Sequence, residues 1–219
     1  MTAPTYVVLL GKQGAGKGTQ GELLRARHGL VHLSTGDILR AAVRAGSDLG
    51  REVSRVLEAG ELVSDDLVNR LVEERLGAPD ASAGAVFDGY PRTRGQAEAL
   101  DRILAPAEVG LCVLVELPDE LVVARLSGRR VCEGCGTNYT HTDPSAQTGV
   151  CERCGGRVVQ RADDTPEAIV ARLAAYERDT RPLIDFYDAK GLLVTIDGDR
   201  SVEAVAASLE GALAARGLA

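Results

Sequence analysis

The sequence contains no tryptophan, and only 3% of its 219 residues are aromatic. Proteins that bind single-stranded nucleic acid stack the bases on aromatic side chains, so the composition argues against that class. The formal net charge of −7 argues in the same direction, because nucleic acids and anionic membrane surfaces attract basic proteins. We therefore expect neither nucleic acid nor a membrane among the partners of this protein.

Long hydrophobic runs are also missing. The opening sequence MTAPTYVVLLG has no basic segment, and its apolar run is shorter than that of a signal peptide. No stretch approaches the roughly 20 apolar residues that a membrane-spanning helix needs. We expect a cytoplasmic protein, and in that compartment paired cysteines more often bind a metal than form disulfides.

Five short segments are apolar at nearly every position, which is typical of strands buried on both faces of a parallel sheet. They are Thr5–Leu10, Leu30–Ser34, Gly84–Asp88, Leu111–Leu117 and Leu192–Asp197. Helical patterns occupy Gly18–Arg27, Gly36–Arg44, Leu49–Ala59, Asp65–Leu76, Arg94–Leu104, Asp119–Ser127, Pro166–Ala189 and Val202–Arg216. This alternation predicts an α/β fold with a parallel sheet and helices on both faces. It fails at 35–64 and 128–163, which we interpret as insertions.

The sequence GKQGAGKGT, Gly11–Thr19, follows the first predicted strand and opens a helix. Its glycines allow backbone N–H groups to surround a phosphate, and the helix N-terminus adds a partial positive charge. Lys17 would reach the β- and γ-phosphates of a nucleotide as a point charge. The hydroxyl that usually follows this lysine is displaced by one residue, to Thr19. An ordinary glycine-rich turn is the alternative interpretation.

The sequence STGDILR, Ser34–Arg40, follows the second predicted strand. Thr35 and Asp37 are residue types that cap helix N-termini, and Arg40 comes less than one turn after Asp37. A phosphate-binding role for Arg40 and a simple helix cap with a solvated arginine are both compatible with this pattern.

The sequence FDGYPRT, Phe87–Thr93, covers the end of the third predicted strand. Asp88 stands at that end, where acidic residues of phosphoryl-transfer proteins commonly face Mg²⁺, directly or through water. Arg92 follows a rigid Gly-Tyr-Pro turn, which suits a guanidinium group fixed against a phosphate. An ordinary turn is the alternative.

Arginines flank the insertion at 128–163 on both sides. They are Arg125, Arg129 and Arg130 before it, Arg161 beside the acidic residues Asp163 and Asp164 at its end, and Arg172 further on. Arginine suits bidentate contacts with phosphate, although a single arginine is more often a surface charge. We expect Arg161 at the exit of the insertion rather than on the helix that carries Arg172.

Four of the five cysteines form two C-x-x-C pairs separated by fifteen residues: Cys132, Cys135, Cys151 and Cys154. This spacing predicts a tetrahedral zinc site with Zn–S bonds of about 2.3 Å. Because four thiolates leave no open coordination position, we expect one structural zinc per chain that pins an insertion too poor in apolar residues to fold alone. Disulfides, another thiophilic metal and the more distant ligand His141 are alternatives.

The motifs GAGKGTQ, STGD-x-x-R, DGYPRT-x-x-Q, GRR and R-x-DD, in this order, resemble those of the adenylate kinase family. The cysteine pairs resemble those of its bacterial, zinc-containing long-lid form, and the resemblance extends from Val7 to Val205. It implies the P-loop nucleoside monophosphate kinase fold, with a core of residues 1–33, 64–127 and 164–219. It further implies an AMP-binding insertion at 34–63 and a lid similar to a zinc ribbon at 128–163.

The resemblance also implies a role for each matching residue. The transferred phosphoryl group would be surrounded by Lys17, Arg92, Arg129, Arg161 and Arg172. ATP would contact Gly14, Ala15, Gly16, Lys17, Gly18, Thr19, Arg129, Asn138, Tyr139 and Arg200. AMP would contact Thr35, Arg40, Glu61, Leu62, Val63, Gly89, Tyr90, Pro91, Arg92, Gln96, Arg161 and Arg172. Asp88 and Asp163 would orient water bound to Mg²⁺.

The implied reaction is ATP + AMP ⇌ 2 ADP, with Mg²⁺ on the ATP, in an enzyme that is monomeric as its family usually is. No general base is required, because the phosphate of AMP is already an anionic nucleophile at neutral pH. The nearest alternative is a kinase for UMP, CMP or GMP. A zinc-ribbon nucleic-acid-binding protein with a regulatory ATP site, and an ATP-binding protein without catalytic activity, are more distant alternatives.

Overall fold

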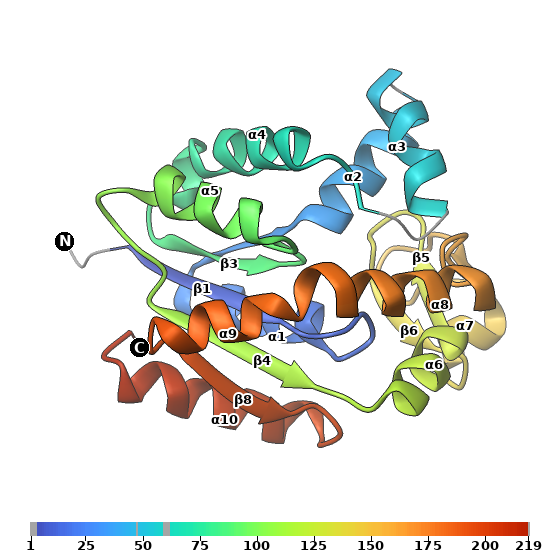
Figure 1. The fold of residues 1–219 in the computed structure, drawn as a ribbon. Coiled ribbons are helices and arrows are strands. Elements are labelled where there is room, and N and C mark those ends of the chain that lie inside the picture. The colour runs from blue at the N-terminus through green and yellow to red at the C-terminus, as the bar shows by residue number, and fades with distance from the viewer. Residues whose placement is uncertain (1–3, 47, 59–61, 219) are drawn as a thin grey trace.

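The computed structural model describes residues 4–46, 48–58 and 62–218, and a parallel sheet lies at its centre (Figure 1). Its strands are β1 (Thr5–Leu10), β2 (Val31–Ser34), β3 (Gly84–Asp88), β4 (Leu111–Glu116) and β8 (Leu193–Asp197). They follow the order β2-β3-β1-β4-β8, and each neighbouring pair is parallel. Every strand lies within one residue of its predicted bounds. The predicted fold class is therefore confirmed.

The α-helices of the described chain match the predicted helical segments closely, apart from one addition in residues 128–163, called the lid segment below, and one interruption in the predicted helix Pro166–Ala189. They are α1 (Lys17–His28), α2 (Thr35–Arg44), α3 (Asp48–Glu58), α4 (Asp65–Leu76), α5 (Arg94–Leu104), α6 (Asp119–Gly128), α7 (Pro144–Thr148), α8 (Pro166–Ala175), α9 (Pro182–Ala189) and α10 (Val202–Ala215). A short 3₁₀ turn at Pro79–Ala81 precedes β3.

The long helix predicted over Pro166–Ala189 is interrupted by a π-helical turn, Tyr176–Thr180, between α8 and α9. The backbone N–H of Arg181 donates to the carbonyl of Tyr176 at 2.8 Å, which is an i→i+5 bond. The next residue, Pro182, has no N–H to donate and occupies the first turn of α9, where none is needed. The proline therefore explains where the single helix ends and the next begins.

Two hydrophobic layers, one on each face of the sheet, form the core. Successive side chains of a strand point to opposite faces, and β1 shows this directly. Val7 and Leu9 pack with residues of α1, α6, α8 and α10, whereas Val8 and Leu10 pack with residues of α4, α5 and α9. In Figure 1, α9 passes in front of the core strands. Helices thus cover both faces, as predicted.

A second, smaller sheet forms within the lid segment. It consists of β5 (Arg129–Cys132), β6 (Asn138–Thr140) and β7 (Val158–Val159), antiparallel in the order β6-β5-β7. Its buried cluster has only four members, Cys132, Tyr139, Cys151 and Val158. No strand was predicted here, because segments of two to four residues carry too little apolar alternation to be recognised.

The carboxyl ends of the core strands point toward the lid segment and toward α2 and α3 (Figure 1). Since the strands are parallel, the segments that follow β1, β2 and β3 all emerge at this one edge of the sheet, where ligands of open α/β folds bind. The topology therefore places the three predicted phosphate-site motifs side by side.

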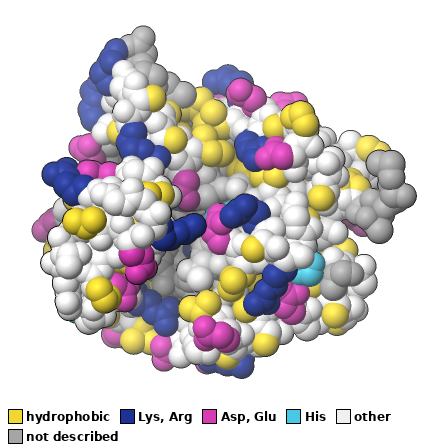
Figure 2. Space-filling view, turned by 180° about the vertical axis from the view of Figure 1, so that it is seen from behind, with side chains coloured by type: hydrophobic (Ala, Val, Ile, Leu, Met, Phe, Trp, Pro, Cys, Tyr) yellow, Lys and Arg dark blue, Asp and Glu magenta, His cyan; other side chains and the backbone are white. Residues whose placement is uncertain are grey.

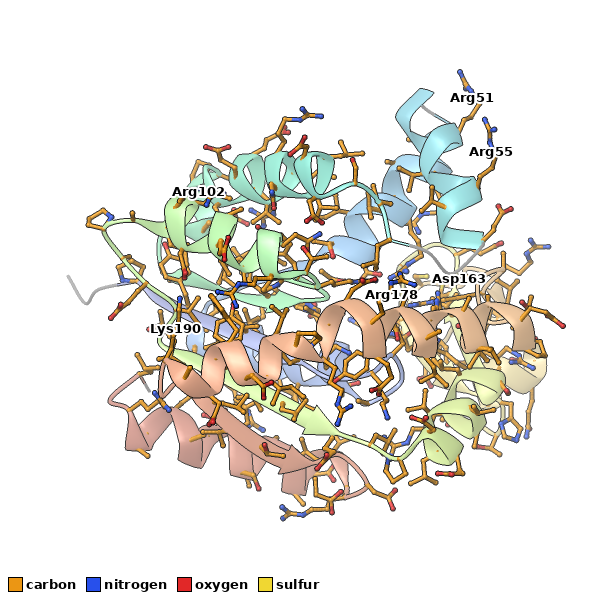
Figure 3. All side chains as sticks on the ribbon, in the orientation of Figure 1. Arg51, Arg55, Arg102, Asp163, Arg178 and Lys190 are labelled. Atoms are coloured by element: carbon orange, nitrogen blue, oxygen red, sulfur yellow. The ribbon has the colours of Figure 1, made fainter. Side chains whose placement is uncertain are left out.

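The outer surface is mixed in character. Basic, acidic and hydrophobic side chains are interspersed on the face shown in Figure 2. Arg51 and Arg55 project from α3 toward the outside of the molecule (Figure 3). A membrane-spanning helix, which needs greater length and apolarity, is not found among the described residues.

Candidate active site

The loop between β1 and α1 depends on its glycines, and Gly11 and Gly16 show why. Gly11 has φ +134°, and a Cβ atom built on it would lie 2.3 Å from the carbonyl oxygen of Val115. Gly16, directly before α1, has φ +99°, in the left-handed half of conformational space that disfavours side chains. These conformations bring the loop close to β4 and turn the start of α1 toward the cleft, as a phosphate loop requires.

Lys17 is the first residue of α1, and only 9% of it is exposed. Its Nζ donates to the carbonyl oxygens of Gly11 at 2.7 Å and of Lys12 at 2.8 Å, so the side chain lies back across the loop. Burial lowers the pKa of Lys17 to about 8, although the charge of Asp88 acts in the opposite direction. The ammonium group is therefore a poorly solvated charge that an anionic ligand would stabilise.

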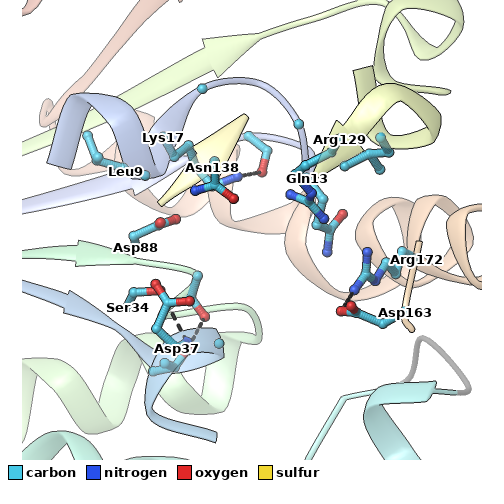
Figure 4. Close-up of a pocket in the computed structure, with 18 of the residues that line it drawn as sticks. Leu9, Gln13, Lys17, Ser34, Asp37, Asp88, Arg129, Asn138, Asp163 and Arg172 are labelled. Atoms are coloured by element: carbon cyan, nitrogen blue, oxygen red, sulfur yellow. Dashed lines mark hydrogen bonds and ion pairs between the residues drawn. The ribbon is translucent and has the colours of Figure 1, made fainter. Parts of the chain in front are cut away.

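Asp88, at the end of β3, faces Lys17 across the cleft (Figure 4). Burial alone would raise its pKa, but His32 and the charge of Lys17 outweigh that effect, so the pKa of Asp88 lies below its ordinary value. His32 Nε2 lies 3.6 Å from Asp88 Oδ2, and its Nδ1 lies 2.8 Å from Glu22 Oε1. Asp88 is thus held as a carboxylate at the edge of the phosphate loop.

The start of α2 differs in one detail from the sequence interpretation. The cap is Ser34, whose Oγ accepts from the backbone N–H of Asp37 at 3.4 Å, rather than Thr35 or Asp37. Ser34 retains the extended backbone of β2, which leaves Thr35 inside the first turn. Thr35 Oγ1 instead donates to the carbonyl of Gly89 at 2.8 Å, and Asp37 accepts from Arg40 at 2.6 Å.

The turn after β3 and the start of α5 form a compact hydrogen-bonded unit. Arg92 Nε donates to the carbonyl of Gly89 at 2.8 Å. The backbone N–H of Arg92 donates to Gln96 Oε1 at 2.8 Å, and Gln96 Nε2 donates to Asp65 Oδ1 at 2.7 Å. Gln96 is only 2% exposed, yet it lines the cleft. Its amide therefore borders the cleft in a fixed position.

Acidic residues at the exit of the lid segment gather arginines from two elements. Arg129, at the start of β5, donates to Asp164 from Nε at 2.8 Å and from Nη2 at 2.6 Å. Arg172, on α8, donates to the same carboxylate at 3.0 Å and also pairs with Asp163. Figure 4 shows Asp163 and Arg172 facing each other at the edge of the cleft. The carboxylates therefore hold the two guanidinium groups together.

Arg161 lies outside any helix, as expected, and its Nη2 donates to Asn138 Oδ1 at 2.9 Å. Burial, followed by the charges of Arg129 and Arg40, lowers the pKa of Arg161 to about 9. Burial and neighbouring arginines likewise lower the pKa of Arg172 to about 9. The cleft therefore holds an excess of poorly solvated positive charge, which suits a polyphosphate ligand.

The cleft has a volume of about 490 Å³ and is lined by all three motifs and by the lid segment. The predicted residues that line it are Gly14, Gly16, Lys17, Gly18, Thr19, Thr35, Arg40, Leu62, Val63, Asp88, Gly89, Pro91, Arg92, Gln96, Arg129, Asn138, Tyr139, Arg161, Asp163 and Arg172. Residues from distant parts of the sequence thus meet in one cavity.

Three predicted residues of the described chain are placed differently, and a fourth cannot be compared. Ala15 is buried in the core, and the hydroxyl of the buried Tyr90 donates to Asn69 Oδ1 at 2.8 Å. Arg200 lies between β8 and α10 and donates to Ser208 Oγ at 3.0 Å, while the nearby Val202 lines the cleft. Glu61 lies outside the described residues.

Two further cleft residues had no role assigned from the sequence. Arg125, on α6, donates to the carbonyl of Gly198 at 3.1 Å, and it stands in the sequence among the arginines that precede the insertion. Gln13 projects from the phosphate loop into the same part of the cleft as Arg129 and Arg172 (Figure 4). Its buried Oε1 has no hydrogen-bond partner among the described residues, and no signal in the sequence identified it.

The two C-x-x-C pairs meet in the lid segment, where the Sγ atoms of Cys132, Cys135, Cys151 and Cys154 all lie within 4.8 Å of one another. The Cys132–Cys154 and Cys135–Cys151 Sγ distances are 3.4 and 3.6 Å. A disulfide bond measures about 2.05 Å, whereas a tetrahedron with Zn–S bonds of about 2.3 Å has edges of about 3.8 Å. No cysteine of the described chain is in a disulfide. The cluster can therefore hold one metal ion.

Glycines make room for this cluster. A Cβ atom at Gly156 would lie 3.0 Å from Cys132 Sγ, and one at Gly134 would lie 3.4 Å from Cys154 Sγ. Tyr139 Oη lies 3.1 Å from Cys151 Sγ, so the small core of the lid segment and its thiol cluster are one unit.

Comparison with known proteins agrees with this geometry. The family model described as adenylate kinase matches residues 9–192 of the chain. A protein named adenylate kinase from Symbiobacterium thermophilum is 44% identical over 215 residues, which are 96% of this chain and 99% of that protein. Its namesakes from Carboxydothermus hydrogenoformans and from Thermoanaerobacter sp. are each 45% identical, over 94% and 96% of this chain and 98% and 99% of their own length.

Proposed function

This chain belongs to the adenylate kinase family and catalyses the reversible transfer of a phosphoryl group from ATP to AMP; we propose that Lys17, Arg92, Arg129, Arg161 and Arg172 surround the transferred group. One observation carries the proposal. These cations come from the phosphate loop, the turn after β3, the lid segment and α8, and all of them line a single cleft. Such convergence of poorly solvated positive charge suits two polyphosphate ligands that meet end to end.

Phosphoryl transfer needs alignment and charge neutralisation more than covalent help from the protein. In the proposed arrangement the loop Gly14–Thr19 binds the phosphates of ATP through its backbone N–H groups, and Lys17 lies against the terminal phosphates. Arg92 holds the phosphate of AMP in line with the transferred group. The negative charge that develops on the oxygens of the transferred phosphoryl group is neutralised by Arg129, Arg161 and Arg172. The anionic AMP phosphate attacks directly, without a general base.

Mg²⁺, which accompanies ATP, would supply charge neutralisation between the phosphates. Asp88 suits a role near that cation because it is held as a carboxylate opposite Lys17. Asp163 lies 3.9 Å from Arg40 and pairs with Arg172, at the end of α8 that faces α2 and α3 (Figure 3). We propose that both carboxylates orient cation-bound water rather than ligate the cation themselves.

We also propose that residues 34–63 and 128–163 close over AMP and ATP respectively, and that residues 1–33, 64–127 and 164–219 form the core between them. Both segments contribute side chains to the same cleft, Arg40 and Leu62 from one and Asn138 and Tyr139 from the other. Closure of this kind removes water from the transferred group and prevents hydrolysis of ATP.

The metal of the thiol cluster is proposed to be zinc in a structural role. Zn²⁺ is a borderline-soft ion that four thiolates bind well. An ion with four thiolate ligands has no coordination position left for a phosphate or a water. Cys132 belongs to β5, whose first residue is Arg129, so the metal would fix the strand that carries a cleft arginine.

A monomeric state and a cytoplasmic location remain predictions. The large hydrophobic side chains exposed in the described chain, Val123, Val150, Val170 and Val202, come from four separate elements or loops, which is compatible with a monomer.

A coupled assay for ADP formation across AMP, CMP, UMP and GMP tests the proposed function. We expect AMP to be the preferred acceptor, because the relatives that cover nearly the whole chain are named adenylate kinase. Efficient use of UMP, CMP or GMP with little use of AMP would favour the alternative kinases. ATP binding without ADP formation from any acceptor would mean that the site binds nucleotide without catalysis.

Replacing Arg92 by Ala is expected to weaken AMP binding and lower turnover by about 100-fold, with little change in ATP binding. Arg92 lies half-buried in the turn after β3 and donates to the carbonyl of Gly89, on the side of the cleft assigned to AMP. Equilibrium titrations with each nucleotide, together with steady-state rates, separate the two effects. Arg94→Ala, on the exposed first turn of α5, is the matched control. A fall in ATP affinity alone would assign Arg92 to the other nucleotide.

A further inference from the structure

The side-chain amide of Gln96 is held at both of its polar ends. Its Oε1 accepts from the backbone N–H of Arg92 at 2.8 Å, and its Nε2 donates to Asp65 Oδ1 at 2.7 Å. A backbone N–H can only donate, and a carboxylate can only accept. Rotation of the amide by 180° would therefore place two donors against each other at one end and two acceptors at the other.

The carboxylate of Asp65, at the start of α4, is itself fixed. Its Oδ2 accepts from Thr93 Oγ1 at 2.6 Å, and that hydroxyl oxygen accepts from the backbone N–H of Gln96 at 3.1 Å. The single proton of Thr93 is thus committed to Asp65. The carboxylate lies against Gly95, where a Cβ atom would be 3.1 Å from Oδ2. Asp65 consequently has one position and one hydrogen-bonding character.

The orientation of this amide determines which base it can bind. Oε1 retains one lone pair and Nε2 retains one hydrogen, so the free face of Gln96 presents an acceptor beside a donor. Adenine presents the complementary pair, an amino group that donates beside a ring nitrogen that accepts. Hypoxanthine has the same size, but an oxo group and an N–H replace that pair. It would match only the rotated amide.

We propose that Asp65 is a specificity-determining residue that selects a 6-amino purine over a 6-oxo purine by locking the amide of Gln96. Asp65 does not contact the base in this arrangement, so it acts as a positioning residue. The inference rests on the proposed function, and it takes Gln96, one of the residues expected to contact AMP, as the residue that binds the base. Without the carboxylate, only the N–H of Arg92 opposes rotation, and the site admits both base types.

The test compares AMP with IMP, whose base is hypoxanthine, as phosphoryl acceptors. Asp65→Asn keeps the size of the side chain but can donate as well as accept, so both orientations of Gln96 become possible. We expect the ratio of kcat/KM for IMP to that for AMP to rise about tenfold, as removal of one of two restraints on a buried amide predicts. A change in stability alone would lower both values and leave their ratio unchanged.

Asp66→Asn is the matched control, because it removes the same charge from the first turn of α4 at an exposed position. We expect the wild-type IMP/AMP ratio in this variant. Asp65→Ser, whose hydroxyl also donates or accepts, is a second variant should Asp65→Asn fold poorly. A wild-type ratio in a folded Asp65 variant would overturn the inference, as would an equal rise in the Asp66 variant.

Gln96→Ala separates this inference from the proposed function. If Gln96→Ala leaves the preference for AMP over IMP intact, Gln96 does not read the base, and the proposed AMP site is wrong. If Gln96→Ala reduces that preference while Asp65→Asn does not, the site stands and only the lock is wrong. We expect both variants to reduce the preference, with a rise in IMP use confined to Asp65→Asn.

Discussion

Replacement of Lys17 by Met is expected to lower turnover by about 100- to 1,000-fold, which is the usual loss when one group that stabilises transition-state charge is removed. Met has a similar length and suits the buried position of Lys17, so the packing at the start of α1 should survive. The carbonyls of Gly11 and Lys12 lose their shared donor, which should cost about 1–3 kcal/mol of stability. Steady-state ADP formation and a thermal melt measure the two effects.

Lys12→Met provides the matched control for this experiment. Lys12 stands in the same loop, but its ammonium group pairs with Asp119 and does not line the cleft. We expect its turnover to stay within a few-fold of the wild type. A folded Lys17→Met enzyme with wild-type turnover would show that the charge at this position is unnecessary.

The pH profile gives a second readout of Lys17. Its pKa of about 8 is below the ordinary value because of burial, so the free enzyme loses this positive charge as the pH rises through that region. We expect kcat/KM for ATP to fall above about pH 8 in the wild type. The same descending limb should be absent from the residual activity of Lys17→Met.

Cys151→Ser is expected to release the metal and to lower the melting temperature by about 10 °C, since each kcal/mol corresponds to about 2–4 °C in a chain of this size. The buried cluster of the lid segment contains only Cys132, Tyr139, Cys151 and Val158. That is too little apolar surface to hold the small sheet alone, so metal binding supplies much of its folding free energy. Elemental analysis and thermal melts before and after chelation measure both changes.

Activity at low temperature distinguishes a structural metal from a catalytic one. None of the four cluster cysteines lines the cleft among the described residues, so a metal-free lid that is still folded should retain much of the wild-type turnover. Cys112→Ala, which changes the buried thiol of β4 outside the cluster, should keep the metal. A folded, metal-free enzyme with no chemical step at low temperature would contradict the structural role. Equal stability with and without zinc would contradict it as well.

Features that depend on neighbours along the chain could be read from the sequence. The five core strands are short, continuously apolar and bounded by turn residues, and all of them lie within one residue of prediction. The phosphate loop requires glycines and a lysine at fixed spacing directly between a strand and a helix. The number and spacing of the cysteines were sufficient to predict a metal-binding cluster. In each case a short sequence pattern is enough, because the backbone conformation and the spacing of ligating residues depend on residues that are close in sequence.

Features that depend on partners distant in sequence were decided by the tertiary structure. The sheet of the lid segment was missed, because each of its strands is too short to show a pattern in the sequence. The strands become recognisable only where they pair with one another in the fold. Arg129 and Arg172 could be named as phosphate ligands, but only the fold shows that Asp164 holds both. The position of Gln13 in the cleft had no signal in the sequence, because it depends on where the loop directs the side chain.

The same division applies to the proposed base-binding site. The sequence was sufficient to nominate Gln96, because its amide lies four residues after Arg92 in a recognisable motif. The orientation of that amide could not be derived, because its restraint comes from Asp65, which is 31 residues away on another helix. The type of a residue determines what its side chain can donate or accept. The packing of α4 against α5 determines which amide atom of Gln96 lies on which side, because only the folded chain brings Asp65 and the N–H of Arg92 to the same amide.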